Sequence, residues 1–261
     1  MSTAPQLTPH VEGPLDAPTL VFVQGWPDDM RLWDQLVEVL RPSYRCVRFN
    51  LPNYPGAAYR RWGFSHDEVV DSLAQCIRSV SPQRAVTLIA HDWGAFWSYR
   101  LHQRYPELVE RFVALDIGPV VTPSPRDAVF IAAYQLWLAS AFAVGGPVGD
   151  VMTRAIAPII GSRKPAAELS AKLNYPYFHT WKSLALTGKR PSLSGYAPEV
   201  PFMYLYGGKK AVQFHTQRWL DYVRSRPGNE VVELHETGHW VTRDPKLNDI
   251  VKRFLDRTTA H

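Results

Sequence analysis

The sequence predicts an α/β fold in which a mostly parallel central sheet is flanked by helices and carries an inserted helical cap. Short apolar runs alternate with amphipathic stretches, which is the pattern of parallel strands joined by crossing helices. The alternation stops between residues 119 and 198, where several prolines and two helix-like parts take the place of a strand. The run Ala90-His91-Asp92-Trp93-Gly94 is the third observation, because small residues flank its centre as in a sharp strand-to-helix turn.

The predicted elements alternate along the chain. Apolar runs predict strands at residues 19–23, 46–51, 85–89, 112–115, 202–206 and 231–234. The amphipathic stretches predict helices at residues 30–40, 65–79, 95–104, 215–224 and 245–255. We therefore assign residues 1–118 and 199–261 to an α/β core, and residues 119–198 to a helical cap inserted between two core strands.

Composition restricts the classes of function. Of the 261 residues, 46% are hydrophobic and 20% are charged, as in a globular protein that is long enough to bury a large core. The net charge of +5 is spread thinly, and its pairs, Arg60-Arg61 and Lys209-Lys210, are interpreted as solvated surface. No basic run alternates with aromatic residues, so no nucleic-acid partner is expected.

Cysteines and apolar segments carry less information. Cys46 and Cys76 lack the spacing of a metal site and are expected to be buried free thiols, and we expect neither a metal nor a cofactor.

Residues 1–10 show no cationic start followed by an apolar stretch, which predicts a cytoplasmic protein without a secretory signal. The apolar stretch 128–148 nearly reaches the length of a membrane span, but polar residues and a Gly-Gly-Pro end interrupt it. We interpret it as a lid helix over an apolar pocket, without stable membrane insertion.

Asp92 stands at the centre of the predicted turn. Such a turn strains its central residue, and larger side chains at Ala90 and Gly94 would collide with the neighbouring strand and helix. The carboxylate then lies at a helix N-terminus, where the helix dipole favours negative charge and the backbone N–H of Trp93 can point at an oxyanion. The turn therefore predicts a nucleophile, with simple N-capping by Asp92 as the alternative.

Candidate partners of Asp92 follow other predicted strands. Asp116 comes directly after the strand at 112–115, and His239 lies in the loop after the last strand. Because the carboxyl ends of parallel strands share one edge of the sheet, the three side chains are expected to meet there as nucleophile, acid and base. The alternative for Asp116 is a loop carboxylate that caps Gly118.

Three motifs together resemble the branch of the α/β-hydrolase superfamily that contains epoxide hydrolases and haloalkane dehalogenases. They are the pair Asp92-Trp93, the run Gly238-His239-Trp240-Val241 and the early loop Gln24-Gly25-Trp26-Pro27. The resemblance covers most of the chain outside the cap and implies the α/β-hydrolase fold with an Asp nucleophile. It also implies an oxyanion hole formed by the backbone N–H groups of Trp26 and Trp93.

The chain departs from that family in three places. Gln24 stands where the early loop usually has His. No acid follows the strand at 202–206, where many epoxide hydrolases carry one, so the role falls to Asp116, as in fluoroacetate dehalogenases and some haloalkane dehalogenases. The loop at 50–56 replaces an Asp-x-Arg-Gly-like sequence, and the sequence alone does not explain this change.

The leaving group decides the substrate class. A carboxylate nucleophile attacks saturated carbon and leaves an alkyl ester on the enzyme, which water activated by His239 then hydrolyses. An epoxide needs a proton donor, which the resemblance places on cap tyrosines, although tyrosines also serve in plain packing. Its candidates are Tyr134, Tyr175 and Tyr177. A halide needs N–H donors, and its candidates are Trp26, Trp93 and Trp181. We predict an enzyme that opens an epoxide to a diol, with a dehalogenase of alkyl halides or haloacids as the alternative.

Other functions stay open on the same fold. Cofactor-independent dioxygenases and hydroxynitrile lyases use a His–acid pair without a covalent ester, and the loop Gly25-Trp26-Pro27-Asp28-Asp29 faintly resembles the dioxygenases. Signal receptors of this fold keep a triad without turnover. The expected partner is a small, largely apolar organic substrate, and a homodimer stays open.

Overall fold

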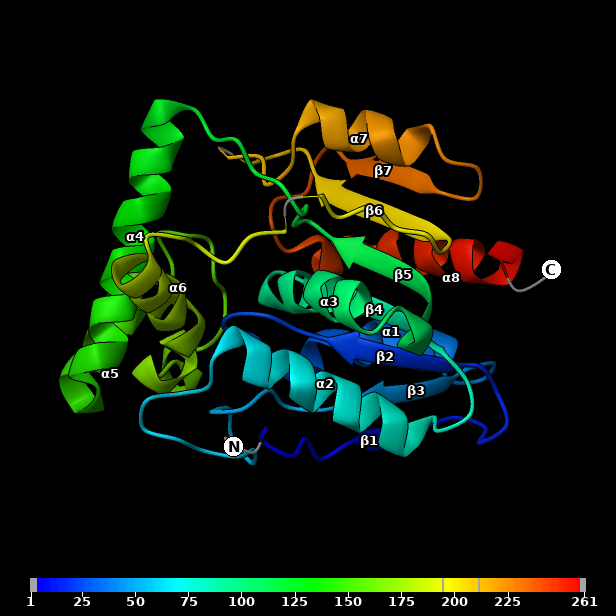
Figure 1. Ribbon diagram of the computed structural model, residues 1–261, viewed down its shortest axis with the longest axis horizontal. Coiled ribbons are helices and arrows are strands. Elements are labelled where there is room, and N and C mark those ends of the chain that lie inside the picture. The colour runs from blue at the N-terminus through cyan, green and yellow to red at the C-terminus, as the bar shows by residue number, and fades with distance from the viewer. Residues whose placement is uncertain (1–3, 194, 211, 259–261) are drawn as a thin grey trace.

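A seven-stranded sheet forms the centre of the computed structural model, which describes residues 4–193, 195–210 and 212–258 (Figure 1). The strands are β1 (His10–Glu12), β2 (Thr19–Val23), β3 (Arg45–Arg48), β4 (Val86–His91), β5 (Val109–Leu115), β6 (Phe202–Gly207) and β7 (Glu230–Leu234). Their order across the sheet is β1-β3-β2-β4-β5-β6-β7, and β1 pairs antiparallel with β3 while the other pairs are parallel. The predicted mostly parallel α/β sheet is confirmed.

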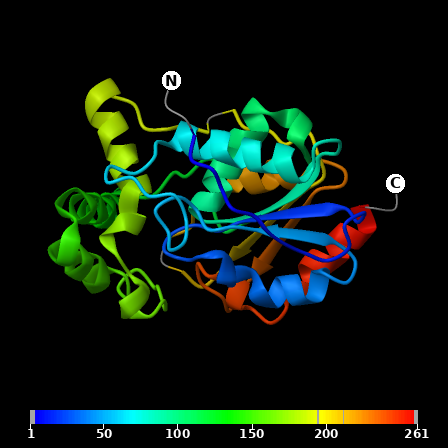
Figure 2. The same ribbon diagram turned by 90° about the horizontal axis from the view of Figure 1, so that it is seen from below.

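Helices cover both faces of the sheet, as Figures 1 and 2 show. They are α1 (Asp34–Leu40), α2 (His66–Val80), α3 (Trp93–Arg104), α7 (Gln217–Arg224) and α8 (Leu247–Thr258). Successive strand side chains point to opposite faces, so Leu88 and Ala90 join the core beneath α2 and α3, whereas Ile89 joins the core beneath α1 and α8. Burial on both faces explains why the central strands are continuous apolar runs.

Local sequence signals set where α2 begins. The Ser65 side chain accepts a hydrogen bond from the Glu68 N–H at 3.3 Å, and the Glu68 carboxylate accepts one from the Ser65 N–H at 2.8 Å. This capping box satisfies two backbone donors at the helix start. One side of α2 is then buried by its apolar positions, among them Val69, Leu73 and Ile77.

The helical insertion that the sequence predicts as a cap, and that is called the cap below, lies between β5 and β6 at the carboxyl end of the strands (Figure 1). Its helices are α4 (Pro125–Val144), α5 (Gly146–Ile156) and α6 (Tyr175–Thr187). Helix α4 begins with Ser124 as N-cap and Pro125 in its first turn, and its C-cap is Gly145, whose φ of 65° favours glycine. By length and composition alone this helix is apolar enough to cross a membrane, and 22% of its most apolar window is buried.

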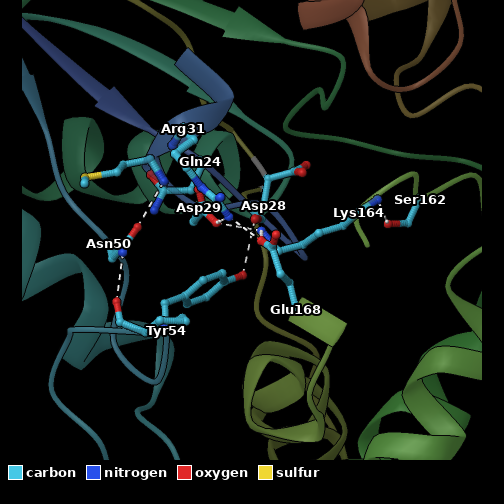
Figure 3. A network of polar contacts seen from close by, with 12 residues as sticks. Gln24, Asp28, Asp29, Arg31, Asn50, Tyr54, Ser162, Lys164 and Glu168 are labelled. Atoms are coloured by element: carbon cyan, nitrogen blue, oxygen red, sulfur yellow. Dashed lines mark hydrogen bonds and ion pairs between the residues drawn. The ribbon is translucent and has the colours of Figure 1, made fainter. Parts of the chain in front are cut away.

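Ion pairs hold the cap against the core beside the candidate site (Figure 3). Lys164 of the cap lies 2.6 Å from the carboxylate of Asp29 in the core, and each side chain is only 9% exposed. Glu168 of the cap pairs with both Lys164 and Arg31. The hydrogen bonds from Arg31 and Lys164 outweigh burial and lower the pKa of Asp29, which keeps this carboxylate ionised.

Candidate active site

The turn at Asp92 has the strained geometry that its sequence predicts. Asp92 has φ 53° and ψ −126°, in the left-handed half of conformational space that non-glycine residues rarely adopt. A Cβ at Gly94 would lie 2.1 Å from the carbonyl oxygen of Val23, so only glycine fits there. The turn places the Asp92 carboxylate beyond the end of β4, at the start of α3.

The structure brings Asp92, Asp116 and His239 together, as expected from the strand ends. Nε2 of His239 lies 3.6 Å from Oδ1 of Asp92, and Nδ1 of His239 lies 2.6 Å from Oδ2 of Asp116. The Asp116 side chain is fully buried. The Gly118 N–H donates to the carbonyl of Phe214 instead of to Asp116, so the capping alternative for Asp116 is wrong.

The two predicted oxyanion donors also converge. The Trp26 N–H donates to Oδ2 of Asp92 at 2.7 Å, and the Trp93 N–H hydrogen-bonds to the same carboxylate. The Trp26 N–H therefore holds Oδ2, and Oδ1 is the oxygen that faces His239. Because the two oxygens have different neighbours, Oδ1 is suited to attack carbon, and Oδ2 is suited to carry the negative charge of a tetrahedral intermediate.

Burial and charge set the protonation states of the three side chains. Burial raises the pKa of Asp92 to about 6, against the opposing effects of His239 and the two N–H groups. Burial alone would raise the pKa of Asp116, but the hydrogen bond from His239 and the charge of Lys210 lower it to about 2. Burial lowers the pKa of His239, but Asp116 and Asp92 outweigh this effect, and the net shift is upward.

Lys210 is a site residue that the sequence analysis missed. The pair Lys209-Lys210 was interpreted as solvated surface, but the Lys210 side chain is 8% exposed and forms an ion pair with Oδ1 of Asp116. The Gly207 N–H donates to the same oxygen at 3.0 Å. Burial lowers the pKa of Lys210, and Asp116 opposes this. Lys209 does fit the prediction, because it is 69% exposed. No sequence signal separates the two neighbours.

Lys210→Met is expected to move the acid limb of base-catalysed hydrolysis to higher pH. A general base must be neutral to take a proton from water, and the Lys210 charge disfavours protonated His239. Removing that charge raises the pKa of His239, so more of the imidazole is protonated at a given acidic pH. The pH profile of single-turnover ester hydrolysis measures this, with Lys209→Met as the matched control. Equal profiles for both variants would contradict the role given to Lys210.

His91 fixes the loop that carries His239. Its Nε2 donates to the His239 carbonyl at 2.9 Å, and the two imidazole rings lie 4.7 Å apart. Burial lowers the pKa of His91 to about 3, so its ring is neutral in the physiological range. Its role is positional, and the sequence analysis did not anticipate it.

A cavity of about 690 Å³ opens between the cap and the core over Asp92 and His239. Four of the predicted aromatic residues line it, namely Trp26, Trp93, Tyr134 and Tyr177. Tyr177 meets Trp93 edge-on at 5.3 Å between ring centroids, and Tyr134 meets Tyr177 in the same way at 6.2 Å. The charge of Asp92 contributes to raising the pKa of both tyrosines, after the larger effect of burial.

Two predicted site residues do not line the cavity. Tyr175 is fully buried against Trp97, and its hydroxyl has no hydrogen-bond partner among the described residues. Residues two positions apart on a helix point in nearly opposite directions, so α6 cannot direct both Tyr175 and Tyr177 into one cavity. Trp181 packs beneath the guanidinium of Arg190. The placement of Tyr175 and Trp181 in the site was therefore wrong.

The unusual loops have structural partners. Gln24 donates from Nε2 to the Phe49 carbonyl at 2.9 Å, and Tyr54 donates to the Gly25 carbonyl at 3.3 Å. Asn50 accepts from the Met30 N–H at 3.0 Å and donates to the Pro55 carbonyl at 2.9 Å (Figure 3). The loop at 50–56 thus supports the early loop that supplies the Trp26 N–H.

Cys46 and Cys76 are buried free thiols, as predicted. The described residues contain no group of three or more His, Cys, Asp or Glu side chains placed to hold a metal.

Comparison with known families agrees with this geometry. A family model described as alpha/beta hydrolase fold matches residues 18–148, half of the chain. The chain belongs to the α/β-hydrolase fold family. The matched part includes the early loop, the turn at Asp92 and Asp116, and it ends within the cap.

Curated relatives of this α/β hydrolase include three kinds of enzyme. Epoxide hydrolase 2 of Caenorhabditis elegans is 30% identical over 48% of this chain and 34% of its own length. A haloalkane dehalogenase of Bradyrhizobium diazoefficiens is 29% identical over 42% and 36%. A cis-3-alkyl-4-alkyloxetan-2-one decarboxylase of Shewanella oneidensis is 22% identical over 92% and 82%. The chain thus spans about a third of the length of the first relative, and it spans most of the decarboxylase.

Solved structures share the whole fold. A thermophilic esterase from Thermogutta terrifontis superposes with a TM-score of 0.76 at 14% identity, over 96% of this α/β hydrolase and 93% of the esterase. An epoxide hydrolase from Bacillus megaterium gives a TM-score of 0.68 at 18% identity, over 96% of both chains. At such identities the likeness extends to the fold alone.

Proposed function

We propose that this α/β hydrolase opens epoxides to diols through a covalent ester at Asp92. The observation that carries the proposal is the pair of phenols, Tyr134 and Tyr177, in the same cavity as Asp92 and His239. Opening an epoxide creates an alkoxide, and a phenol hydroxyl is a suitable proton donor to it. The resemblance to epoxide hydrolases and the Caenorhabditis elegans relative support the same substrate class.

The proposed first step uses Oδ1 of Asp92. This oxygen attacks one ring carbon, the carbon–oxygen bond of the ring breaks, and the leaving oxygen takes a proton from a tyrosine hydroxyl. His239 then removes a proton from water, and the hydroxide attacks Cγ of Asp92. Charge develops on Oδ2, where the N–H groups of Trp26 and Trp93 stabilise it. Collapse breaks the Cγ–Oδ1 bond, and Oδ1 leaves in the diol with the proton that His239 had taken from water. The carboxylic acid re-formed at Asp92 then loses its proton, which restores the tyrosine hydroxyl.

A halide leaving group has weaker support. Of the three indoles considered for a halide site, Trp181 does not line the cavity, and the Trp26 indole N–H already donates to Oδ1 of Asn174 at 2.8 Å. Trp93 remains, and its side chain hydrogen-bonds to Tyr177. Dehalogenation is therefore the second candidate.

A strained lactone is a further substrate to assay, because the Shewanella oneidensis decarboxylase matches 92% of this chain. Its oxetan-2-one ring, like an epoxide, releases strain when a carboxylate opens it. A panel of styrene-type epoxides, chloroalkanes, fluoroacetate and a cis-3,4-dialkyl-oxetan-2-one separates the candidates. Turnover of chloroalkanes or fluoroacetate without turnover of epoxides would contradict the proposal. If the enzyme turned over no compound of the panel, the proposal would also fail, and the receptor and dioxygenase hypotheses would be favoured instead.

Tyr134→Phe and Tyr177→Phe are each expected to slow epoxide opening by about 10- to 10,000-fold, the range of a positioned general acid. Each change removes one hydroxyl and keeps the ring, so packing is little affected. Tyr175→Phe is the matched control, because it removes a hydroxyl that is buried outside the cavity and has no hydrogen-bond partner among the described residues. Pre-steady-state measurement of ester formation gives the rate. Normal rates in both cavity variants would contradict the proton-donor role.

A further inference from the structure

The outer face of the cap is apolar and exposed. Among the described residues, ten of the fourteen exposed large hydrophobic side chains belong to the cap. Figures 1 and 2 show α4 and α5 on the side of the cap that points away from the sheet. We define the outer cap face as Val129, Phe130, Leu136, Trp137 and Val144 of α4 with Val148 and Val151 of α5, which are 44–70% exposed.

Helix α4 is apolar on more than its packed side. Leu138, Ala141 and Phe142 bury one side of the helix within the protein. The exposed positions recur every three or four residues and are mostly apolar, with Arg126 and Ser140 as polar exceptions. Trp137 donates its indole N–H to the Met152 carbonyl at 2.8 Å, which joins α4 to α5. A helix that is apolar all round normally has a covered outer side.

Charge on the cap indicates what covers that side. Residues 119–198 contain eight Lys and Arg residues against three Asp and Glu residues, whereas the remainder of the chain contains 21 of each. The whole net charge of +5 therefore belongs to the cap. A cap that is both cationic and apolar is complementary to a bilayer with acidic lipids, whose headgroups are anionic and whose acyl layer is apolar.

The cavity opens beside this face. Phe130 is 45% exposed and Ile159 is 70% exposed, and both also line the cavity above Asp92. Arg163 lines the cavity as well. Apolar surface thus continues from the outside of the cap into the cavity.

We propose that the outer cap face docks on the surface of an anionic lipid bilayer, with the cavity mouth turned toward the acyl layer. The apolar side chains enter the headgroup region, and the exposed Lys and Arg residues of the cap, which do not include Lys164, contact lipid phosphates. Helix α4 lies on the bilayer and does not cross it, because its other side packs within the cap. Entry of an apolar substrate from the bilayer rests on the proposed function, but docking does not.

A second copy of the chain fits the face less well. In a twofold dimer the same surface meets itself, so two caps of charge +5 would face each other. Like charges in such an interface repel. The same positive charge attracts the cap to the headgroups of an anionic bilayer.

Co-flotation of the full chain with vesicles tests the proposal. Phosphatidylcholine vesicles with 30% phosphatidylglycerol should bind the protein, and pure phosphatidylcholine vesicles should bind it more weakly. Val148→Glu/Val151→Glu should weaken binding by about tenfold or more, because two anionic groups enter the contact. Leu15→Glu/Val39→Glu is the matched control, with the same change of charge on exposed core positions. Raised salt should reduce binding of the wild type.

Three outcomes would overturn the proposal. They are no binding to anionic vesicles, equal weakening in the cap variant and the core variant, and a lipid-free dimer that the cap variant alone dissociates in sedimentation velocity. The last outcome would assign the face to a second copy of the chain. Because no activity is read, a failure here is separate from a failure of the epoxide proposal.

Discussion

His239→Gln leaves Asp92 able to form an ester but slows hydrolysis of that ester by about 10²- to 10⁴-fold or more, so the alkylated enzyme accumulates. The imidazole lies 3.6 Å from Oδ1 of Asp92, where it can activate water, whereas the attack of a carboxylate on carbon needs no base. With a pKa of about 6, Asp92 is mostly ionised above neutral pH.

Intact-protein mass spectrometry of His239→Gln after mixing with substrate makes the measurement. An epoxide adds its whole mass to the enzyme, whereas an alkyl halide adds its mass less that of the hydrogen halide, so the adduct also reports the leaving group. The wild type, sampled at the same times, is the control and should carry little adduct. Full turnover by His239→Gln without an adduct would remove His239 from the mechanism.

Asp92→Asn is expected to reduce turnover by about 10⁴- to 10⁶-fold, the loss typical when a covalent nucleophile is removed. The amide keeps the shape of the carboxylate but lacks its charge and its nucleophilic oxygen. Asp28→Asn is the control, because this neighbouring carboxylate accepts a hydrogen bond from the Trp240 indole at 2.6 Å and interacts with Asp92 and His239 through its charge. Burial is the main cause of the raised pKa of Asp28.

Steady-state assays on the epoxide panel compare the two variants, and circular dichroism verifies that both are folded. Asp28→Asn should keep most of the wild-type activity. The nucleophile assignment would fail if Asp92→Asn stayed active while Asp28→Asn lost its activity.

The core could be read from the sequence because its strands are buried on both faces. Strand β2 has the predicted bounds, Thr19–Val23, and β6 and β7 lie within one residue of their predicted bounds at each end. Strand β4 begins one residue after its predicted start and ends two residues after its predicted end. Strand β1 was missed because it is only three residues long, which is too short to show the alternation of a strand in the sequence. It forms by pairing with β3, which is distant in the sequence. Strand β5 begins at Val109 instead of residue 112, since Glu110 and Arg111 interrupt the apolar run.

The candidate triad could be predicted for a related reason. Asp92, Asp116 and His239 each follow a strand, and parallel strands end at one edge of the sheet. The environment of each group was not predictable. Burial of Lys210 depends on the path of the loop after β6, and the direction of Tyr175 depends on how α6 rotates against the core.

Oxygen-18 labelling in a single turnover tests the covalent ester most directly. Excess wild-type enzyme is mixed with an epoxide in H₂¹⁸O, and the diol and the peptide that contains Asp92 are analysed by mass spectrometry. Water attacks Cγ of Asp92 in our account, so the label enters the Asp92 carboxylate and the first diol is unlabelled. Label in the first diol, with an unlabelled Asp92 peptide, would mean that water attacks the epoxide directly and would contradict the account.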